Sequence, residues 1–310
     1  MKNSIVDLII SLISGSLRIS IPIAFGALGA TFAERSGIIS LGLEGMMLSG
    51  AFFGTLGSYI TGNAYAGLLF AMAGGGVFGL IHALLTIKFK TDHVISGVGI
   101  NLLGQGLTTV LLQVIWGNRG KSPEVSGLGN IRLPFMYNVP FLGKMLGSVS
   151  PLFIIMIAVI IVSWILLYKT VFGLRIRVIG ENPQAADTLG IDVYKIQYIC
   201  VVLSGVLAGI GGAYLSIGDI NMFGRDMVAG RGYIAVAATI FGGWNPAGVF
   251  VGSLLFGLAQ SLQIRLQVFK IPVQFVQMLP YIVTILVLML SRKSQRGPGA
   301  VGKHFIRGES

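Results

Sequence analysis

Charged residues are scarce in this sequence. Only 11% of its 310 residues are charged, 54% are hydrophobic, and the mean hydropathy is +0.84. Soluble domains usually carry about 25% charged residues. The shortage of charge excludes an ordinary soluble domain and indicates a chain that lies almost wholly in lipid.

Cysteine and histidine are also rare. Cys200, the single cysteine, lies in an apolar run, where a thiol acts as a small buried hydrophobe. His82, His93 and His304 are scattered without a second ligand at the spacing of a metal site, so we expect no metal. The amino terminus lacks the basic segment and cleavage site of a signal peptide, and we expect it to remain in the mature fold.

Motifs for catalysis and nucleotide hydrolysis are missing as well. Gly120-Lys121-Ser122 matches the end of a phosphate-binding loop, but Ile115 stands where that loop requires glycine. There is no Gly-x-Ser-x-Gly turn and no pair of carboxylates at a useful spacing. We therefore expect a chain that is not an enzyme and holds no cofactor, with any ATP bound by a partner subunit.

The net charge of +11 does not indicate a nucleic-acid partner. Lys and Arg are scattered among short loops, and no basic face is interleaved with exposed aromatic residues. We expect no nucleic acid among the partners of this chain.

Long apolar runs recur from end to end. Crossing a bilayer takes about 20 apolar residues, and eight runs qualify: 17–33, 38–60, 64–87, 94–116, 152–168, 196–217, 248–266 and 273–290. Tyr233–Phe241 is apolar but too short to cross alone, which is typical of a re-entrant or half helix buried in protein. The sequence predicts an all-α, polytopic membrane bundle with about eight full spans plus this short helix.

The predicted domain organisation follows from these runs. Residues 1–16 form a short helix, residues 17–291 a single transmembrane permease-like domain, and residues 292–310 a basic cytoplasmic tail. Within the domain we expect an extracytoplasmic loop at 118–150 and a cytoplasmic loop at 169–195. The distribution of Lys and Arg favours this orientation only slightly, because basic residues also occur in the outer loop.

Glycine is abundant, with 45 residues, and recurs at four-residue spacing inside the runs. In lipid, such small residues let helix backbones approach closely. Packing within the chain is the simpler interpretation, and a seam between subunits is the alternative. The pairs are Gly50 and Gly54, Gly75 and Gly79, Gly205 and Gly209, and Gly248 and Gly252.

Four polar residues inside the apolar runs are candidates for a substrate path. Glu44 is an intramembrane carboxylate, although it can equally lie near a helix end, paired with Arg35 or hydrogen-bonded to a glycine-rich turn. Asn101, Gln105 and Gln113 recur at spacings of four and eight on one helical face. Amides suit a neutral polar solute, because they donate and accept hydrogen bonds without the desolvation cost of charge. Hydrogen bonding between helices is the alternative.

Four motifs occur in order along the chain. They are ERSGIISLGLEGMM at 34–47, VISGVGINLL at 94–103, GLRIRVIGENPQAADTLGI at 173–191, and GRGYIA at 230–235 with FGGWNPAG at 241–248. Together they resemble the bacterial ABC importer permeases of the branched-chain amino acid and ribose type, most closely the branch assigned to nucleosides or simple sugars. The resemblance covers nearly the whole chain.

The resemblance implies a multi-pass protein of the bacterial cell membrane that forms half of a translocation path for a nucleoside. A permease for a simple sugar such as ribose or galactose is the nearest alternative, and an ion-coupled secondary transporter is a more distant one. The implied partners are a cytoplasmic ABC ATPase, a second related permease in a heterodimer, and an extracytoplasmic substrate-binding lipoprotein.

The resemblance also implies two segments that seat against the ATPase. A coupling element needs a short rigid helix held on a loop, so that movement of the ATPase is passed to the helices. The first segment contains Glu181, Gln184, Ala185, Ala186 and Gly190, and the second contains Gly243, Trp244, Asn245 and Pro246. Either segment can also be a solvated connector.

Overall fold

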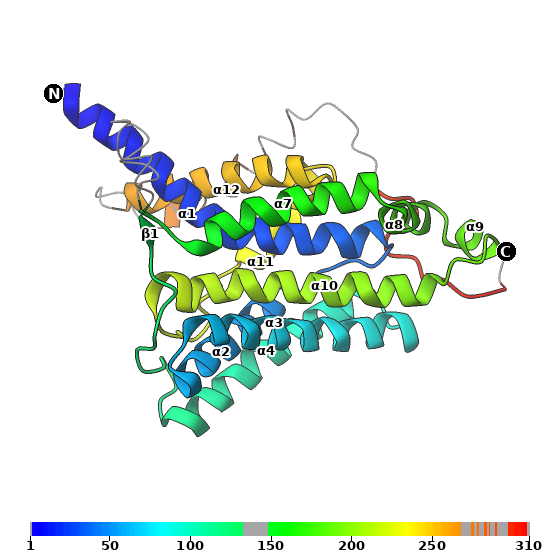
Figure 1. The fold of residues 1–310 in the computed structure, drawn as a ribbon, viewed down its shortest axis with the longest axis horizontal. Helices are drawn as coiled ribbons and strands as arrows, with labels where there is room; N and C mark the ends of the chain where they lie inside the picture. The colour runs from blue at the N-terminus through cyan, green and yellow to red at the C-terminus, as the bar shows by residue number, and fades with distance from the viewer. Residues whose placement is uncertain are drawn as a thin grey trace.

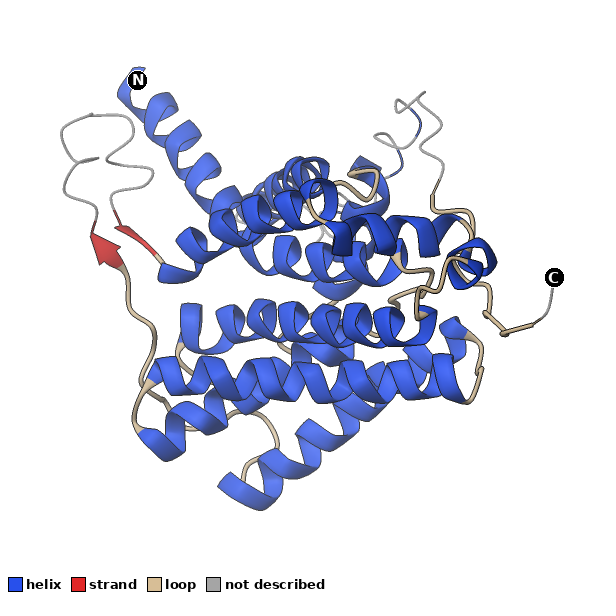
Figure 2. Ribbon diagram, turned by 45° about the vertical axis from the view of Figure 1, so that its right-hand side comes forward, coloured by secondary structure: helices blue, strands red, loops and turns tan. Residues whose placement is uncertain are grey.

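The computed structural model describes residues 2–132, 148–267 and 297–308, together with isolated positions between 274 and 289. The described chain is built almost entirely of helices (Figure 2). Two strands of two residues each, β1 (Ile131–Arg132) and β2 (Ser148–Val149), pair antiparallel at one end of the molecule. The predicted all-α class is confirmed.

The helices follow one another with mostly short connections, apart from the long loop between α4 and α7. After α1 (Lys2–Arg35) come α2 (Leu43–Thr61), α3 (Ala64–Ala83) with its π-helical extension η1 (Leu84–Lys88), α4 (His93–Trp116), α7 (Pro151–Lys169), α8 (Val171–Glu181), α9 (Pro183–Thr188), α10 (Val193–Ala213) with its π-helical extension η2 (Tyr214–Ile220), α11 (Arg231–Phe241) and α12 (Pro246–Leu266).

Helix α1 is longer than expected. We expected a separate short helix over residues 1–16, but α1 continues from Lys2 to Arg35 without a break. The hydroxyl of Ser16 donates to the carbonyl oxygen of Leu12 at 2.7 Å, one turn earlier. A polar side chain that is satisfied in this way does not end a helix in an apolar environment.

Six helical segments of the described chain are long and apolar enough to cross a membrane. They are Ile10–Arg35, Ala64–Lys88, His93–Trp116, Pro151–Lys169, Val193–Ile220 and Pro246–Leu266. The predicted run 38–60 becomes helix only from Leu43, and the resulting α2 is too rich in glycine and hydroxyl residues to be among the six. The run 273–290 lies outside the continuously described residues. The short apolar helix expected at 233–241 is present as α11.

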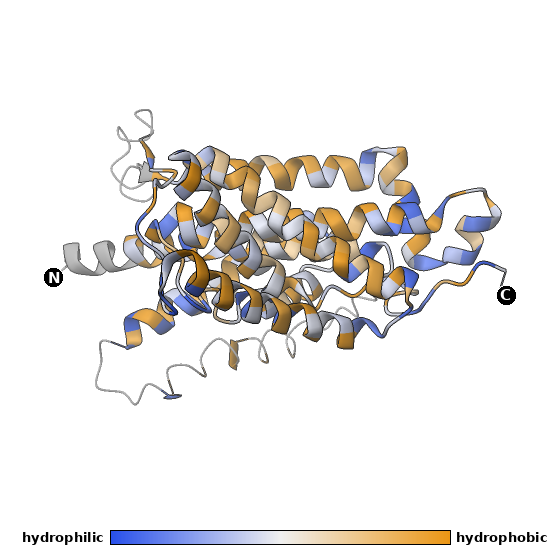
Figure 3. Ribbon diagram, turned by 90° about the horizontal axis from the view of Figure 1, so that it is seen from below, coloured by the Kyte–Doolittle hydropathy of each residue, from blue (hydrophilic) through white to orange (hydrophobic). Residues whose placement is uncertain are grey.

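The helices form two layers on either side of α10 (Figure 1). One layer contains α1, α7 and α12, and the other contains α2, α3 and α4. Hydrophilic residues gather at the two ends of the bundle and hydrophobic ones between them (Figure 3). Helices α8 and α9 lie at the same end as the carboxy-terminal segment, and the strand pair lies at the other.

Glycine contacts join α10 to α2 and α3. A Cβ on Gly50 would collide with the backbone of Gly209, and a Cβ on Gly75 would collide with the carbonyl of Gly205. The other members of the four-residue pairs also pack inside the chain: Gly54 against Ala71 and Ala213, Gly79 against Val201 and Gly205, Gly248 against Gly242, and Gly252 against Ala238. Packing within the chain is therefore confirmed for these glycines.

Two connections between helices of the bundle are not helical. Residues 36–42 lead from α1 to α2, and residues 221–230 lead from η2 to α11. Inside a membrane, such backbone is tolerated only where its polar groups find partners. Gln197 donates to the Ser36 carbonyl at 3.0 Å, and the His82 Nε2–H donates to the Ile39 carbonyl at 3.0 Å.

The second connection is covered by the long loop that follows α4. The amides of Ser122, Val125 and Leu128 donate to the carbonyls of Phe223, Asn221 and Ile217 at 2.8 to 2.9 Å. The described part of the loop expected at 118–150 thus forms an ordered cover over the connection between η2 and α11.

We predict that Gly50→Ala lowers the stability of the folded chain by about 1–3 kcal/mol, because the new methyl group meets backbone that cannot rotate away. Unfolding of the purified protein in detergent measures the effect. Gly106→Ala is the matched control, since nothing lies within 4 Å of a Cβ at Gly106. Equal stability of the two variants would contradict the packing described here.

Candidate functional site

Glu44 lies at the start of α2 and faces the start of α11. Its side chain is buried, with 7% of its surface exposed. Oε1 accepts from the amide of Gly230 at 2.7 Å, and Oε2 accepts from the amide of Gly232 at 2.8 Å. These amides belong to the first turn of α11, where backbone N–H groups have no partner inside the helix. The carboxylate therefore caps α11 from a different helix, and its charge is favourable there because a helix amino terminus is positive.

Asn101 joins the same cluster from α4. Its Oδ1 accepts from the amide of Gly45 at 2.8 Å, and its Nδ2 donates to the Leu41 carbonyl at 2.9 Å and to the Tyr233 hydroxyl at 3.0 Å. With 4% of its surface exposed, Asn101 is enclosed by protein. The geometry corresponds to hydrogen bonding between helices.

Gln105 and Gln113 lie elsewhere on α4. Both side chains are exposed, on the side of α4 that does not pack against α2. The sequence grouped Asn101, Gln105 and Gln113 on one face, but a turn of 100° per residue spreads them over a third of the helix surface. The structure brings Asn101 to Glu44 and leaves the two glutamines on the outer surface.

The first expected docking segment forms α8, α9 and the turn after α9. Asn182 caps α9 by accepting from the Ala185 amide at 3.0 Å, and Pro183 begins the helix. Gly190 ends the turn with φ of +76°, a conformation that favours glycine. Of the predicted residues, Glu181, Gln184, Ala185 and Gly190 are exposed, whereas Ala186 is buried and anchors α9.

The second expected docking segment is the turn between α11 and α12. Trp244 is in the left-handed region with φ of +52°, and its ring is buried, with 8% of its surface exposed. Gly243 and Asn245 are half-buried and Pro246 is buried. Asn245 caps α12 by accepting from the Ala247 amide at 3.1 Å.

The last two residues of α1 hold this turn in place. The indole Nε1–H of Trp244 donates to Glu34 Oε2 at 2.6 Å. The guanidinium of Arg35 donates to the carbonyl oxygens of Trp244 at 3.0 Å and Gly243 at 3.4 Å. No role for Glu34 was predicted from the sequence, and Arg35 was considered only as a partner for Glu44. Their adjacency at the end of an apolar run was the available signal.

The carboxy-terminal segment 297–308 crosses the same end of the bundle. The Ala300 amide donates to the Gly180 carbonyl at 2.8 Å, and the Gly302 amide donates to the Gly37 carbonyl at 3.0 Å. Arg307 donates to Asp187 Oδ1 at 2.8 Å, and this contact raises the pKa of the guanidinium. This part of the predicted basic tail ties α8 and α9 to the connection between α1 and α2.

Leu189 is a candidate that the sequence analysis missed. It lies in the turn after α9 with 74% of its surface exposed, at a polar end of the molecule. An apolar side chain exposed among polar residues is typical of a protein contact. The signal in the sequence was a leucine directly before Gly190, the glycine of the turn that follows α9.

None of these arrangements resembles a catalytic centre. Cys200 is buried inside α10, where it packs as a small hydrophobic side chain. Among the described residues, no group of three His, Cys, Asp or Glu side chains is placed to hold a metal ion. What the structure offers is a polar cluster inside a helical bundle and two ordered loops at one of its ends.

Residues 12–288 match the family described as the permease component of the branched-chain amino acid transport system. The chain belongs to this permease family. It is 40% identical to the guanosine ABC transporter permease protein NupQ of Bacillus subtilis, over 98% of this chain and 99% of that one. It is 39% identical to the nucleoside ABC transporter permease protein NupC of Lactococcus lactis, with the same coverage.

A second permease of Bacillus subtilis is a more distant relative. The guanosine ABC transporter permease protein NupP is 25% identical to this chain, over 76% of this chain and 69% of its own length. Family membership and the six apolar helices place the permease in the cell membrane as a multi-pass protein.

We predict opposite behaviour for two α4 substitutions. Asn101→Leu leaves the buried Gly45 amide without a partner and removes the hydrogen bond to the Leu41 carbonyl, and we expect a loss of about 1–3 kcal/mol of stability. Gln105→Leu removes an exposed amide and should change stability by less than about 0.5 kcal/mol. Unfolding in detergent separates the two cases. A Gln105→Leu variant as unstable as Asn101→Leu would contradict the placement of these side chains.

Proposed function

We propose that this permease forms half of the translocation path of an ABC importer for nucleosides. The observation that carries the proposal is the near-complete match to two permeases named for guanosine and nucleosides. The physical character of the chain agrees with such a cargo, because its membrane-embedded polar groups are mostly neutral amides and hydroxyls. A nucleoside is neutral and rich in hydrogen-bonding groups, so it needs such partners rather than a charged site.

The other half of the path is proposed to be a second, related permease. The exposed face of α4 favours a protein partner, because it carries Gln105 and Gln113 beside two glycines. At these glycines, Gly99 and Gly106, an added Cβ would meet nothing within 4 Å. Polar groups and small residues on one helix face are costly against lipid and favourable against another helix. The occurrence of NupP and NupQ in one organism, both named for guanosine, supports a heterodimer.

The end that carries α8 and α9 is proposed to face the cytoplasm and to receive a separate ABC ATPase. Nine of the basic residues lie at this end or next to it, which agrees with the positive-inside rule: Arg35, Lys88, Lys90, Lys169, Arg175, Arg177, Lys195, Lys303 and Arg307. The opposite end then faces outward and receives the substrate-binding lipoprotein. Helix α2 is proposed as a seventh span beside the six apolar helices, and the run 273–290, the eighth that the sequence predicts, lies outside the continuously described residues.

Coupling is proposed to run through both docking segments. Glu181, Gln184, Ala185, Gly190 and Leu189 form the exposed contact surface of the first segment. The turn at 243–246 forms the second contact and is fixed to α1 by Glu34 and Arg35. Because the segment 297–308 joins α8 and α9 to residue 37, a shift of the ATPase reaches the connection that leads into α2.

Reconstitution tests the proposed function. The permease is assembled with its ATPase, second permease and binding protein in proteoliposomes, and uptake of labelled nucleosides, ribose, galactose and leucine is measured. We expect ATP-dependent uptake of nucleosides, and none when the ATPase is left out. Uptake by this chain alone under an ion gradient would contradict the importer assignment, and uptake of a sugar but no nucleoside would contradict the cargo.

We predict that Leu189→Asp reduces ATP-dependent uptake at least roughly tenfold, because a charge replaces an apolar contact at a protein interface. Amounts of folded permease in the membrane should stay normal, since the Leu189 side chain has few contacts within the chain. Phe89→Asp is the control, because Phe89 is 66% exposed on a different loop at the same end. Equal loss of uptake in both variants would contradict a specific role of the α9 turn.

A further inference from the structure

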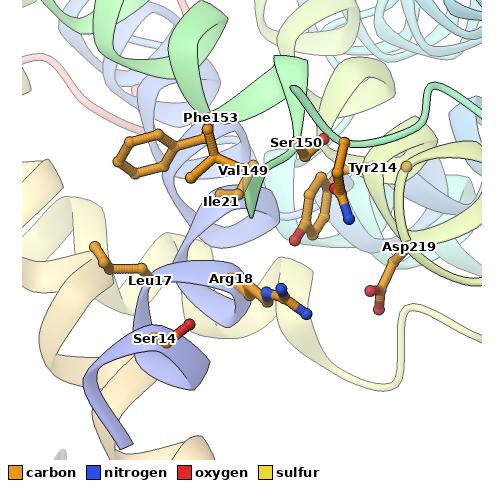
Figure 4. Close-up of a pocket in the computed structure, with 11 residues that line it drawn as sticks. Ser14, Leu17, Arg18, Ile21, Val149, Ser150, Phe153, Tyr214 and Asp219 are labelled. Atoms are coloured by element: carbon orange, nitrogen blue, oxygen red, sulfur yellow. The ribbon is translucent and has the colours of Figure 1, made fainter. Parts of the chain in front are cut away.

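A pocket of about 110 Å³ opens at the end of the bundle that we propose to be outer. It lies between the first half of α1, the π-helix η2 and the start of α7 (Figure 4). Arg18 and Ser14 come from α1, Tyr214 and Asp219 from η2, and Phe153 from α7. The substrate-path candidates Glu44, Asn101, Gln105 and Gln113 do not line this pocket.

Arg18 and Asp219 place opposite charges on two sides of the pocket. In Figure 4 the guanidinium of Arg18 extends toward the side of the pocket that holds Asp219. Among the described residues, neither side chain has an ion-pair partner within 4.0 Å. Arg18 belongs to a predicted span, Ile10–Arg35, and charged residues inside spans are costly unless they face a polar cavity or a ligand.

The helix that carries Asp219 is unusual in its own right. η2 extends α10 by seven residues with π-helical hydrogen bonding, which is rare and frequent at functional sites. The wider turn brings Tyr214, Gly218 and Asp219 together on the wall of the pocket. A regular α-helix spaces positions i, i+4 and i+5 over a wider arc, so the π-helix is the reason that this wall has both a ring and a carboxylate.

The chemistry of the lining disfavours ligands that carry a charge of one sign. A phosphate or other anion is disfavoured by the Asp219 carboxylate, and a cation is disfavoured by Arg18. A neutral group with adjacent hydroxyls suits both side chains, because the carboxylate accepts hydrogen bonds from the two hydroxyls and the guanidinium donates to the hydroxyl oxygens. The rings of Tyr214 and Phe153 offer flat apolar surface for the carbon skeleton.

We infer that this pocket is an entry subsite for a sugar ring with a vicinal diol, such as the ribose of a nucleoside. The inference rests on the proposed function for the direction of transport and deepens it by naming the part of the solute that the permease itself recognises. Asp219 and Arg18 hold the two hydroxyls, and Tyr214 packs against the ring.

Cysteine labelling from the outer side tests the subsite. Ser14→Cys is introduced in a Cys200→Ala background, and the assembled transporter is reconstituted without its binding protein. A charged, membrane-impermeant methanethiosulfonate is the reagent, and adenosine, free ribose and 2′,3′-dideoxyadenosine are the probes. Asn130→Cys, at another position of the pocket lining, serves as a second reporter if Ser14→Cys does not assemble.

We expect adenosine and ribose to slow labelling of Ser14→Cys roughly tenfold or more, which is the range for hydrogen bonds to charged groups. Dideoxyadenosine, which lacks both hydroxyls, should not slow it. Adding Asp219→Asn should abolish the protection, whereas Glu124→Gln, an exposed acid at the same end, should leave it intact. Ser126→Cys, exposed outside the pocket, is the labelling control and should react equally with and without ribose.

Two outcomes would overturn the inference: labelling of the pocket cysteine that no probe slows, or protection by dideoxyadenosine equal to that by adenosine. ATP-dependent uptake is measured on the same vesicles after the binding protein is added back. This measurement distinguishes a failure of the proposed subsite from a failure of the proposed function. Uptake of nucleosides without protection of the pocket cysteine would contradict the subsite but not the proposed importer function. Protection by ribose in vesicles that take up no nucleoside would support the subsite and contradict the assignment of nucleosides as the cargo.

Discussion

The hydrogen bonds between the Glu44 carboxylate and the first turn of α11 hold the centre of this permease together. Helices α2 and α11 both begin inside the bundle, so each brings unpaired amide groups into a region without water. A buried carboxylate is costly by itself, and so is the bare start of a helix. The carboxylate accepts hydrogen bonds from the amides at the start of α11, so both costs are offset. Asn101 adds hydrogen bonds to the backbone of Leu41 and Gly45.

This arrangement explains how the chain keeps irregular backbone at membrane depth. The connections at 36–42 and 221–230 are held by side chains from α3, α4 and α10 and by the loop that follows α4. Irregular backbone of this kind occurs in membrane proteins where it is enclosed by protein or lines a cavity. Both connections end at Glu44: residues 36–42 lead into the start of α2, and residues 221–230 end at Gly230, whose amide donates to the Glu44 carboxylate.

The sequence predicted what depends on local pattern. Apolar length identified eight runs, six of which are apolar helices long enough to cross a membrane, and the short α11. Glycine spacing identified close helix packing, and four motifs identified the permease family. It did not predict contacts that depend on the tertiary fold. Helical spacing could not show that Asn101 is enclosed while Gln113 is exposed, because both lie on apolar stretches of the same helix. The hydrogen bonds of Glu34 and Arg35 with the turn around Trp244 join residues about 210 positions apart, and no local pattern encodes such a pairing.

The backbone contacts among α2, α3 and α10 have a consequence for motion. Where Gly50 meets Gly209 and Gly75 meets Gly205, no side chains separate the helices, so there are no rotamers whose exchange would let one helix slide past another. Sliding by less than a full residue would press carbonyls into α-carbons. These three helices therefore form one closely packed block. Helix α1 is joined to this block in the same way, because a Cβ on Gly29 would collide with the backbone of Ser204 in α10.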